Sequence, residues 1–379
     1  MYLATCSTSH IVKAIEQLGY KKGMSAMLLV AEQETMHVPA IIDTLNKQNI
    51  HFFGGIFPGL IYHKKRYSEG IIILVFPMVY PAFLIENLHQ EDQIKLPAFY
   101  NLINSTMTKY LSIILVDGLS ANIAFFLSEL HGHLGQNVSF FGGGAGSSSL
   151  EQSPCIFNNQ GCFQDAALVA FIDLTAELSI SHGWQYLSGP FIATKTDRNI
   201  IKELNWQNAY EVYSNTINQY SEEKINMVNF FNIAQKFPFG IYQDANNNTV
   251  RDPIAVNDRQ ELVCVGEVPQ NTILNILYGT QESLIMAVEH SIKGCFQKSN
   301  GTIKHGLTMS CLSRMFFLKN NYQDELATIN DNITTNNPDI VLEGAITLGE
   351  IAANNMGILE FFNKTVVTSI ISNYNNNEE

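Results

Sequence analysis

Phe140-Phe141-Gly142-Gly143-Gly144-Ala145-Gly146-Ser147-Ser148-Ser149 is the stretch around which the rest of the sequence is organised. It follows an apolar strand pattern, and four of the five positions from 142 to 146 are glycine. Glycine permits a positive φ and lets another chain segment or a ligand approach the backbone closely. Gly142, Gly143, Gly144 and Gly146 therefore indicate either a loop that lines a ligand site or a close-packed corner of the fold.

The sequence contains an earlier version of this stretch, FFGGIFPG, at residues 52–59. A continuous apolar run precedes each version, at residues 26–31 and 112–117, which is the pattern of strands buried on both faces. A helical pattern, with apolar residues three and four apart, lies between each run and its glycines, and a further strand pattern follows the glycines. We expect residues 25–76 to superpose on residues 111–172.

The C-terminal part of the sequence repeats this order of elements, with Gly349-Glu350-Ile351 in the place of the glycine stretch. The sequence therefore predicts an α/β fold with two domains, residues 1–180 and 181–379. Both are built from internally duplicated strand-helix-strand units with glycine loops at strand ends. Loops gathered at the strand ends of such sheets usually hold the ligand.

The composition limits the classes of protein to consider. With 379 residues, of which 46% are apolar, the chain can bury large cores. Its 35 acidic and 22 basic residues give a formal net charge of −13, and no dense basic block is present, so nucleic-acid binding is disfavoured. The apolar stretch at residues 71–85 contains Pro77 and Pro81 and is shorter than the ~20 residues that span a bilayer. Since the N-terminus also lacks the pattern of a signal peptide, we expect a cytoplasmic protein without a transmembrane segment.

The polar residues form no recognised catalytic pattern. The glycine stretch lacks the third glycine of the dinucleotide-binding fingerprint and a P-loop lysine, and the serines after it lie in no GxSxG elbow. His131-Gly132-His133 has a spacing that could bind a metal, but no cysteine or carboxylate partner is near, so a solvated helix end is favoured. We predict that the protein is not an enzyme, although residues distant in the sequence could still converge in a pocket.

Five short motifs follow one another along the second half of the chain. They are His182-Gly183-Trp184, Arg251-Asp252-Pro253, Ser310-Cys311-Leu312-Ser313-Arg314, Leu348-Gly349-Glu350-Ile351 and Phe362-Asn363-Lys364-Thr365. In this order they resemble the bacterial FIST proteins. The first half, with its paired glycine stretches, looks like the FIST N domain and the second half like the FIST C domain, so the resemblance covers nearly the whole chain.

The resemblance implies a signal-input module that senses a small ligand, for which amino acids have been proposed. FIST domains commonly accompany histidine kinases, chemotaxis receptors or cyclic-di-GMP enzymes, and a subset, the nitric-oxide-sensing proteins, is reported to bind haem. The chain leaves no room for an output domain, so we expect a histidine kinase or a cyclic-di-GMP enzyme as a separate partner. Haem with nitric oxide sensing is the leading hypothesis, and a sensor of an amino acid or another small metabolite, without haem, is the alternative.

His182 is the candidate haem ligand. It lies with Gly183 and Trp184 at the predicted junction of the two halves, and pockets often form at such junctions. A neutral imidazole can ligate haem iron, and Trp184 would cover the macrocycle. The alternative is a histidine that only forms structural hydrogen bonds at the junction, in which case His51 or His305 could be the iron ligand.

Two charged residues, Arg314 and Glu350, are expected at strand ends in the second domain. If they face a common cavity, they could hold the carboxylate and the ammonium of an amino acid, Arg314 through its two-pronged guanidinium. They could equally pair with each other as a structural ion pair. Asn363 is a further candidate ligand-binding residue, and with Thr365 it could instead cap the turn between two strands.

Overall fold

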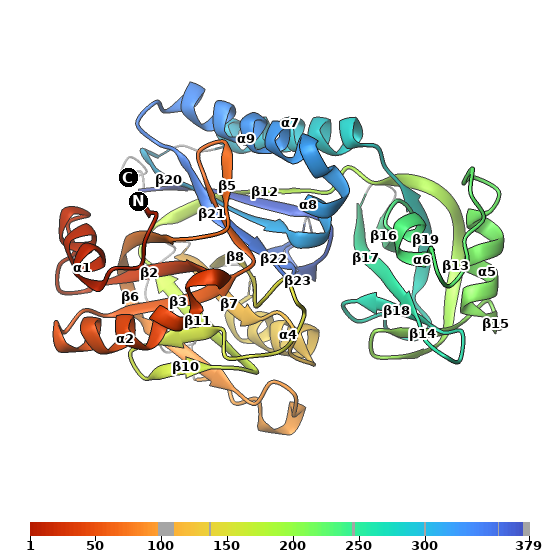
Figure 1. Ribbon diagram of the computed structural model, residues 1–379, viewed down its shortest axis with the longest axis horizontal. Coiled ribbons are helices and arrows are strands. Elements are labelled where there is room, and N and C mark those ends of the chain that lie inside the picture. The colour runs from red at the N-terminus through yellow and green to blue at the C-terminus, as the bar shows by residue number, and fades with distance from the viewer. Residues whose placement is uncertain (98–109, 136–137, 245–246, 299–300, 355, 374–379) are drawn as a thin grey trace.

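The computed structural model describes residues 1–97, 110–135, 138–244, 247–298, 301–354 and 356–373. Its strands form three sheets, of 11, 6 and 7 strands. Figure 1 shows two lobes, a larger one that contains the first two sheets and a smaller one, at the right, that contains the third. The fold is α/β, as the sequence predicts.

The larger lobe contains three copies of one unit, in which a strand, a helical segment and a parallel strand are followed by a hairpin and an antiparallel strand. The first copy consists of β2 (Met24–Ala31), α2 (Val38–Lys47), β3 (Phe52–Phe57), β4 (Gly59–Tyr62), β5 (Lys65–Tyr67) and β6 (Ile71–Glu86). The second consists of β7 (Tyr110–Asp117), α4 (Ile123–Leu134), β8 (Val138–Ala145), β9 (Ile156–Asn158), β10 (Gly161–Phe163) and β11 (Ala166–Ile172). The third consists of β20 (Ile303–Cys311), α8 (Leu312–Leu318), α9 (Tyr322–Asn336), β21 (Leu342–Thr347), β22 (Glu350–Ala353), β23 (Leu359–Phe362) and β24 (Val366–Ser372).

The three copies share one strand order. In each, the first strand pairs in parallel with the second strand and antiparallel with the last. The duplication predicted from the sequence is therefore present, and the third copy extends it. Each hairpin pairs outside its own copy: β4 with β21, β9 with β3, and β22 with β8. Every copy thus depends on another copy to complete its sheet.

The glycines of the organising stretch lie within a strand and not in a loop. Gly142, Gly143 and Gly144 belong to β8 and are buried. A Cβ on Gly142 would lie 1.8 Å from the carbonyl oxygen of Ile114 on β7, so only glycine lets these two strands approach. Gly146, with a φ of +143°, follows the end of the strand. For the first three glycines the geometry is that of a close-packed contact.

The same close contact recurs in the other two copies. A Cβ on Gly54 would lie 2.3 Å from the carbonyl oxygen of Leu28, and one on Gly344 would lie 1.9 Å from that of Thr308. All three glycines lie opposite the residues they approach in the parallel strand pairs. The glycine repeat in the sequence therefore reflects one close strand contact that is present in all three copies.

Helices cover the outer faces of the sheets. In α7 (Gln281–Lys298) the buried residues Leu284, Val288, Ile292 and Cys295 recur three and four apart, so the helix buries one stripe. Figure 1 shows α7 and α9 above the strands of the third copy, α4 below the second copy, and α1 (Thr8–Gln17) beside α2 at the left. Short 3₁₀ helices occur at η1 (Glu32–His37), η2 (Glu91–Gln93) and η4 (Lys319–Asn321).

The smaller lobe is an antiparallel sheet with two helices, inserted between the second and third copies. Its elements are β13 (Gln185–Asp197), β14 (Ile200–Leu204), β15 (Gln207–Asn208), α5 (Ala209–Ile217), α6 (Phe230–Ala234), β16 (Phe239–Asp244), β17 (Asn247–Val256), β18 (Leu262–Val265) and β19 (Ile273–Tyr278). The chain leaves the larger lobe after β12 (Thr175–Ser181), which pairs with β24, and returns to it at α7. At the other end of the chain, β1 (Tyr2–Leu3) pairs with β6. The division at residue 181 stays a prediction.

Candidate functional site

The five motifs found in the sequence meet where the two lobes join. The smaller lobe contributes Arg251 and Asp252 from β17, and the larger lobe contributes the start of α8, the start of β22 and the turn between β23 and β24. Hydrogen bonds link the motifs to one another, because Arg314 donates to His182, Trp184 donates to Lys364, and Arg251 donates to Asn363. The motifs are therefore parts of one junction.

His182 takes part in two hydrogen bonds within this junction. Its Nδ1 accepts from the backbone N–H of Trp184 at 3.0 Å, and its carbonyl oxygen accepts from Nη1 of Arg314 at 2.6 Å. Burial and, to a smaller degree, the charge of Arg314 lower the pKa of His182 to about 4, so the imidazole is neutral at pH 7. These contacts are those of a histidine that forms structural hydrogen bonds at the junction, which was the alternative to a haem ligand.

Trp184 is part of the core beside it. Its indole Nε1 donates to the carbonyl oxygen of Lys364 at 3.2 Å, and its ring packs 4.8 Å from that of Phe317, measured between centroids. The ammonium of Lys364 lies 5.2 Å from the centre of the indole ring, within range of a cation–π contact. The side chain is 4% exposed, so its faces are occupied by protein.

The guanidinium of Arg314 is fully buried and pairs with Glu325 on α9, not with Glu350. Three hydrogen bonds of 2.6 to 3.1 Å join its Nε and Nη2 to the two carboxylate oxygens. The remaining donors reach the backbone carbonyls of His182, Lys364 and Leu284. Because every N–H of Arg314 has a protein acceptor, this side chain has no donor left for a ligand.

Glu350, the first residue of β22, is also fully buried. Its Oε1 accepts from the hydroxyl of Thr347 at 2.8 Å, whereas its Oε2 has no partner among the described residues. Burial raises the pKa of Glu350 well above its usual range, against the smaller effect of the hydrogen bond from Thr347. Burial likewise raises the pKa of the neighbouring Cys311 to about 12. Both groups therefore favour their neutral forms.

Arg251 reaches from the smaller lobe to the larger one. Its Nε donates to the carbonyl oxygen of Glu267 at 2.8 Å, and its Nη1 donates to that of Phe361 at 3.2 Å and to Oδ1 of Asn363 at 3.4 Å. Asn363 is fully buried, and its Nδ2 has no partner among the described residues. Asn363 thus links the lobes by accepting a hydrogen bond from Arg251.

A buried ion pair also crosses the junction. Nζ of Lys364 lies 3.2 Å from Oδ2 of Asp252, and both side chains are fully enclosed. The same Nζ donates to the carbonyl oxygen of Gln235 at 3.1 Å. Burial raises the pKa of Asp252, and the charge of Lys364 opposes that rise. Since Asp252 lies on β17 and Lys364 follows β23, the pair ties one lobe to the other.

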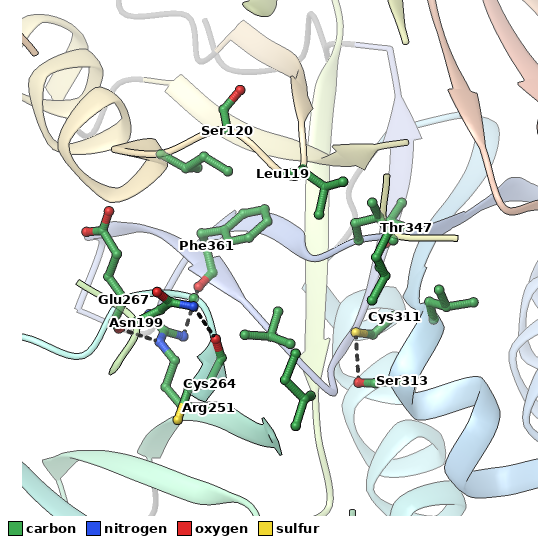
Figure 2. Close-up of a pocket in the computed structure, with 18 of the residues that line it drawn as sticks. Leu119, Ser120, Asn199, Arg251, Cys264, Glu267, Cys311, Ser313, Thr347 and Phe361 are labelled. Carbon is green, nitrogen blue, oxygen red and sulfur yellow. Dashed lines mark hydrogen bonds between the residues drawn. The ribbon is translucent and has the colours of Figure 1, made fainter. Parts of the chain in front are cut away.

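A cavity of about 550 Å³ lies between the lobes, next to these contacts. Figure 2 shows Asn199, Arg251 and Glu267 on one side of it and Cys311, Ser313 and Thr347 on the other. Much of the remaining wall is apolar and comes from both lobes: Leu119, Ile123, Leu150, Phe231, Ile254, Val265, Leu312, Phe316, Leu348 and Phe361. A molecule in this cavity would contact both lobes at once.

The candidate site residues predicted in the second half of the sequence do not form this wall. His182, Trp184, Arg314, Glu350 and Asn363 are not among the residues that line the cavity, although their neighbours Cys311, Ser313 and Thr347 are. The structure therefore brings Arg314 and Glu350 to the same junction but not into a common cavity.

A second cavity, of about 420 Å³, lies beside Gly146. Its wall is polar and apolar in equal parts and includes Glu32, whose carboxylate accepts hydrogen bonds from the hydroxyls of Ser147 and Ser148 at 2.8 and 2.6 Å. Of the four glycines predicted to line a ligand site, Gly146 is the one that borders this cavity.

The sequence was compared with protein-family models. The FIST N domain model matches residues 5–207, and the FIST C domain model matches residues 209–353. The chain belongs to the FIST family. FIST domains are sensor domains of signal transduction. No curated protein matched the chain.

The surroundings of His182 in this FIST protein do not fit a haem site. Its Nδ1 already accepts a hydrogen bond, and the residue borders neither of the two cavities described above. For a metal ion bound directly by side chains, the described residues contain no group of three or more His, Cys, Asp and Glu. Over the same residues, no helix combines the length and the apolar character needed to cross a membrane.

Sequence reasoning missed Arg251 as a residue of the cavity in this FIST protein. The signal in the sequence is a charged residue directly after Val250, within a strand pattern. Sequence reasoning also missed Leu119. In strand register the segment after β7 corresponds to the segment after β20, so Leu119 and Ser313 occupy equivalent positions, and both line the cavity.

Proposed function

We propose that this FIST protein is a sensory protein that binds a small ligand in the cavity between its lobes. The observation that carries this proposal is the cavity itself, because its volume of about 550 Å³ falls within the range of small-molecule sites. Its wall is mostly apolar with a few polar groups, which is the usual make-up of such sites. The family's sensory role fits this use better than catalysis does. That the protein is not an enzyme stays a prediction.

A ligand in this position has a direct means of changing the protein. Because it touches Arg251 in one lobe and Leu119 and Ser313 in the other, its affinity depends on how the lobes are arranged. A ligand shifts an equilibrium between two arrangements by the difference between its affinities for them. The bound arrangement would then be recognised by a separate signalling partner, for which a histidine kinase or a cyclic-di-GMP enzyme is our proposal.

An amino acid or another small metabolite, without haem, is better supported as the ligand than haem with nitric oxide sensing. The contacts of His182 give haem no support, as described above. An absorption spectrum of the protein mixed with haem checks this, with wild type beside His182→Ala. We expect no Soret band that depends on His182. A band that is present in wild type and lost in the variant would restore haem as the leading ligand.

A variant that fills the cavity tests the proposed function. Ala121 lines the cavity and is partly exposed, so Ala121→Trp should fill the site without disturbing the core. Ala40, on the exposed face of α2, lies outside the cavity and provides the control Ala40→Trp. In a screen of small metabolites, a ligand at 100 times its Kd stabilises the folded protein by about 2.7 kcal/mol.

We expect such a ligand to raise the melting temperature of wild type and Ala40→Trp, but not of Ala121→Trp. The compounds recovered from the mixture should be unchanged. An equal shift in Ala121→Trp would place the ligand elsewhere. Conversion of the compound by wild type would make the protein an enzyme.

A further inference from the structure

We infer that the ligand of the cavity between the lobes is an organic anion with an apolar body, whose anionic group binds Arg251. The inference rests on the proposed function, because it takes this cavity as the ligand site. It adds the chemical class of the ligand, which the family and the cavity volume leave open.

Arg251 forms no ion pair with a described carboxylate. Burial lowers the pKa of its guanidinium, and the more distant charges of Glu360 and Glu267 oppose this only in part. Arg251 and Arg314 are the two buried arginines of the described chain, with 7% and 0% of their surfaces exposed, and only Arg314 has an acidic partner. The four hydrogen bonds of Arg251 end on three backbone carbonyls and the amide oxygen of Asn363. No described carboxylate lies within 4.0 Å of its guanidinium. A buried charge that lacks a directly bonded carboxylate is costly, so an anion beside it would bind favourably.

Arg251 also retains a donor for that anion. Its Nε and Nη1 supply all four hydrogen bonds, while Nη2 donates to no described residue. Nη2 is not fully enclosed by protein, and Arg251 lines the cavity. Nη2 can therefore donate a hydrogen bond to a ligand there. Arg198, an exposed residue of the same wall, adds a second positive charge. With Glu267 as the one acidic residue among the described residues that line it, the wall carries a net positive charge, in a protein whose overall formal charge is −13.

The rest of the wall calls for an apolar body. Leu119, Ile254, Leu348 and Phe361 come from both lobes and leave about 550 Å³ between them, far more than an inorganic anion fills. Each methylene that such a body buries strengthens binding about fourfold. The ligand is therefore expected to extend from Arg251 along these apolar side chains.

The polar groups favour a simple anion over an amino acid. An amino acid also needs a partner for its ammonium, and Glu350, the residue predicted for this role, does not line the cavity. Glu267 does line it, but its carboxylate already accepts a hydrogen bond from the backbone N–H of Asn122 at 3.2 Å and attracts the guanidinium of Arg251. An ammonium in this cavity would also be repelled by Arg251 and Arg198. We therefore expect an added ammonium group to weaken binding.

A matched series of compounds tests the inference by calorimetry on the whole protein. The series is 3-phenylpropanoate, its neutral amide, phenylalanine, acetate and inorganic phosphate. We expect 3-phenylpropanoate to bind about tenfold or more tightly than the amide, because a hydrogen bond to a charged group is stronger than a neutral one. Acetate and phosphate should bind more weakly, because acetate buries only one methyl group and phosphate buries no apolar surface.

Three variants locate the anion. In Arg251→Gln the affinities of the acid and the amide should become equal. Arg198→Gln should weaken the acid about threefold, since this charge is exposed and screened. Arg259→Gln is the matched control, because Arg259 is also exposed and lies outside the cavity. If Arg251→Gln fails to fold, the comparison of acid, amide and phenylalanine in wild type still decides.

Several results would overturn the inference. They are equal affinity for the acid and the amide, tighter binding of phenylalanine than of the acid, no binding of the acid at millimolar concentration, and an undiminished preference for the acid in Arg251→Gln. A neutral compound whose melting shift is abolished by Ala121→Trp would leave the proposed function standing and defeat this inference alone.

Discussion

Arg314 forms its ion pair with Glu325, eleven residues further along the chain, and the side chains of both are completely enclosed by protein. The pair joins α8 to α9, and the other donors of the guanidinium bind backbone carbonyls at the junction of the lobes. Arg314 is therefore a structural residue, although its position after an apolar strand suggested contact with a ligand.

Removing the acidic partner should destabilise the protein strongly. In Glu325→Gln the guanidinium stays buried without a balancing charge, and breaking a buried pair in this way costs about 3–5 kcal/mol. Asp43→Asn is the control, since the pair of Asp43 with Lys47 is exposed and should contribute ~0.5 kcal/mol or less. Urea unfolding of the two variants beside wild type measures both values. Similar losses in the two variants would contradict the role assigned to Glu325.

The glycine contacts between parallel strands lead to a second prediction. In Gly142→Ala the new methyl group would lie 1.8 Å from the carbonyl oxygen of Ile114, so the strands must separate, at a cost of roughly 1–3 kcal/mol or more. Gly294 lies within α7 with open space around its Cβ position, so Gly294→Ala should stabilise the protein by ~0.5–1 kcal/mol. Thermal unfolding should shift in opposite directions for the two variants. A neutral effect of Gly142→Ala would mean that the strands are less closely packed than described.

The sequence predicted the repeated unit because its signals are local. Apolar runs, helical spacing and the FFGG stretches each lie within one copy. The exchange of hairpins was not predictable in this way, because β4 finds its partner β21 more than 250 residues away. A four-residue strand such as β4, Gly-Leu-Ile-Tyr, carries no pattern that specifies its partner, so the partner is decided by how the copies pack together.

The site was harder to predict than the fold, for a reason that Arg251 and Arg314 illustrate. Both are charged residues in buried segments, and both belong to motifs that resemble the family. Which of them faces a ligand depends on which one has a carboxylate partner within the protein. Glu325 takes that role for Arg314, and it lies on α9, eleven residues further along the chain. The pairing of Arg314 with Glu325 can be recognised only from the three-dimensional structure.

The neutral imidazole of His182 makes stability depend on pH. Its pKa is lowered to about 4 in the folded protein, against an ordinary value of about 6.5, so the unfolded chain binds more protons between these values. Its contribution to stability is therefore complete above pH 6.5 and is lost as the pH falls toward 4. His305, with its pKa also lowered to about 4, acts in the same direction.

A variant isolates the share of His182. In His182→Asn the amide oxygen can accept the hydrogen bond from Trp184, and no group titrates at this position. We expect the loss of unfolding free energy between pH 7 and pH 4.5 to be smaller in this variant by ~1–3 kcal/mol. Urea unfolding at several pH values measures it. Parallel curves for wild type and variant would show that His182 keeps its ordinary pKa in the folded protein.

The ion pair of Asp252 and Lys364 should couple the two lobes energetically. Each single variant, Asp252→Asn or Lys364→Met, leaves the other charge buried, at a cost of about 3–5 kcal/mol. The double variant removes both charges, so it should be destabilised by less than the sum of the two single losses, with a coupling of ~1–3 kcal/mol. The matched cycle with Lys195→Met and Glu203→Gln, an exposed pair within the smaller lobe, should show a coupling near zero. Additive losses at Asp252 and Lys364 would mean that their charges do not hold the lobes together.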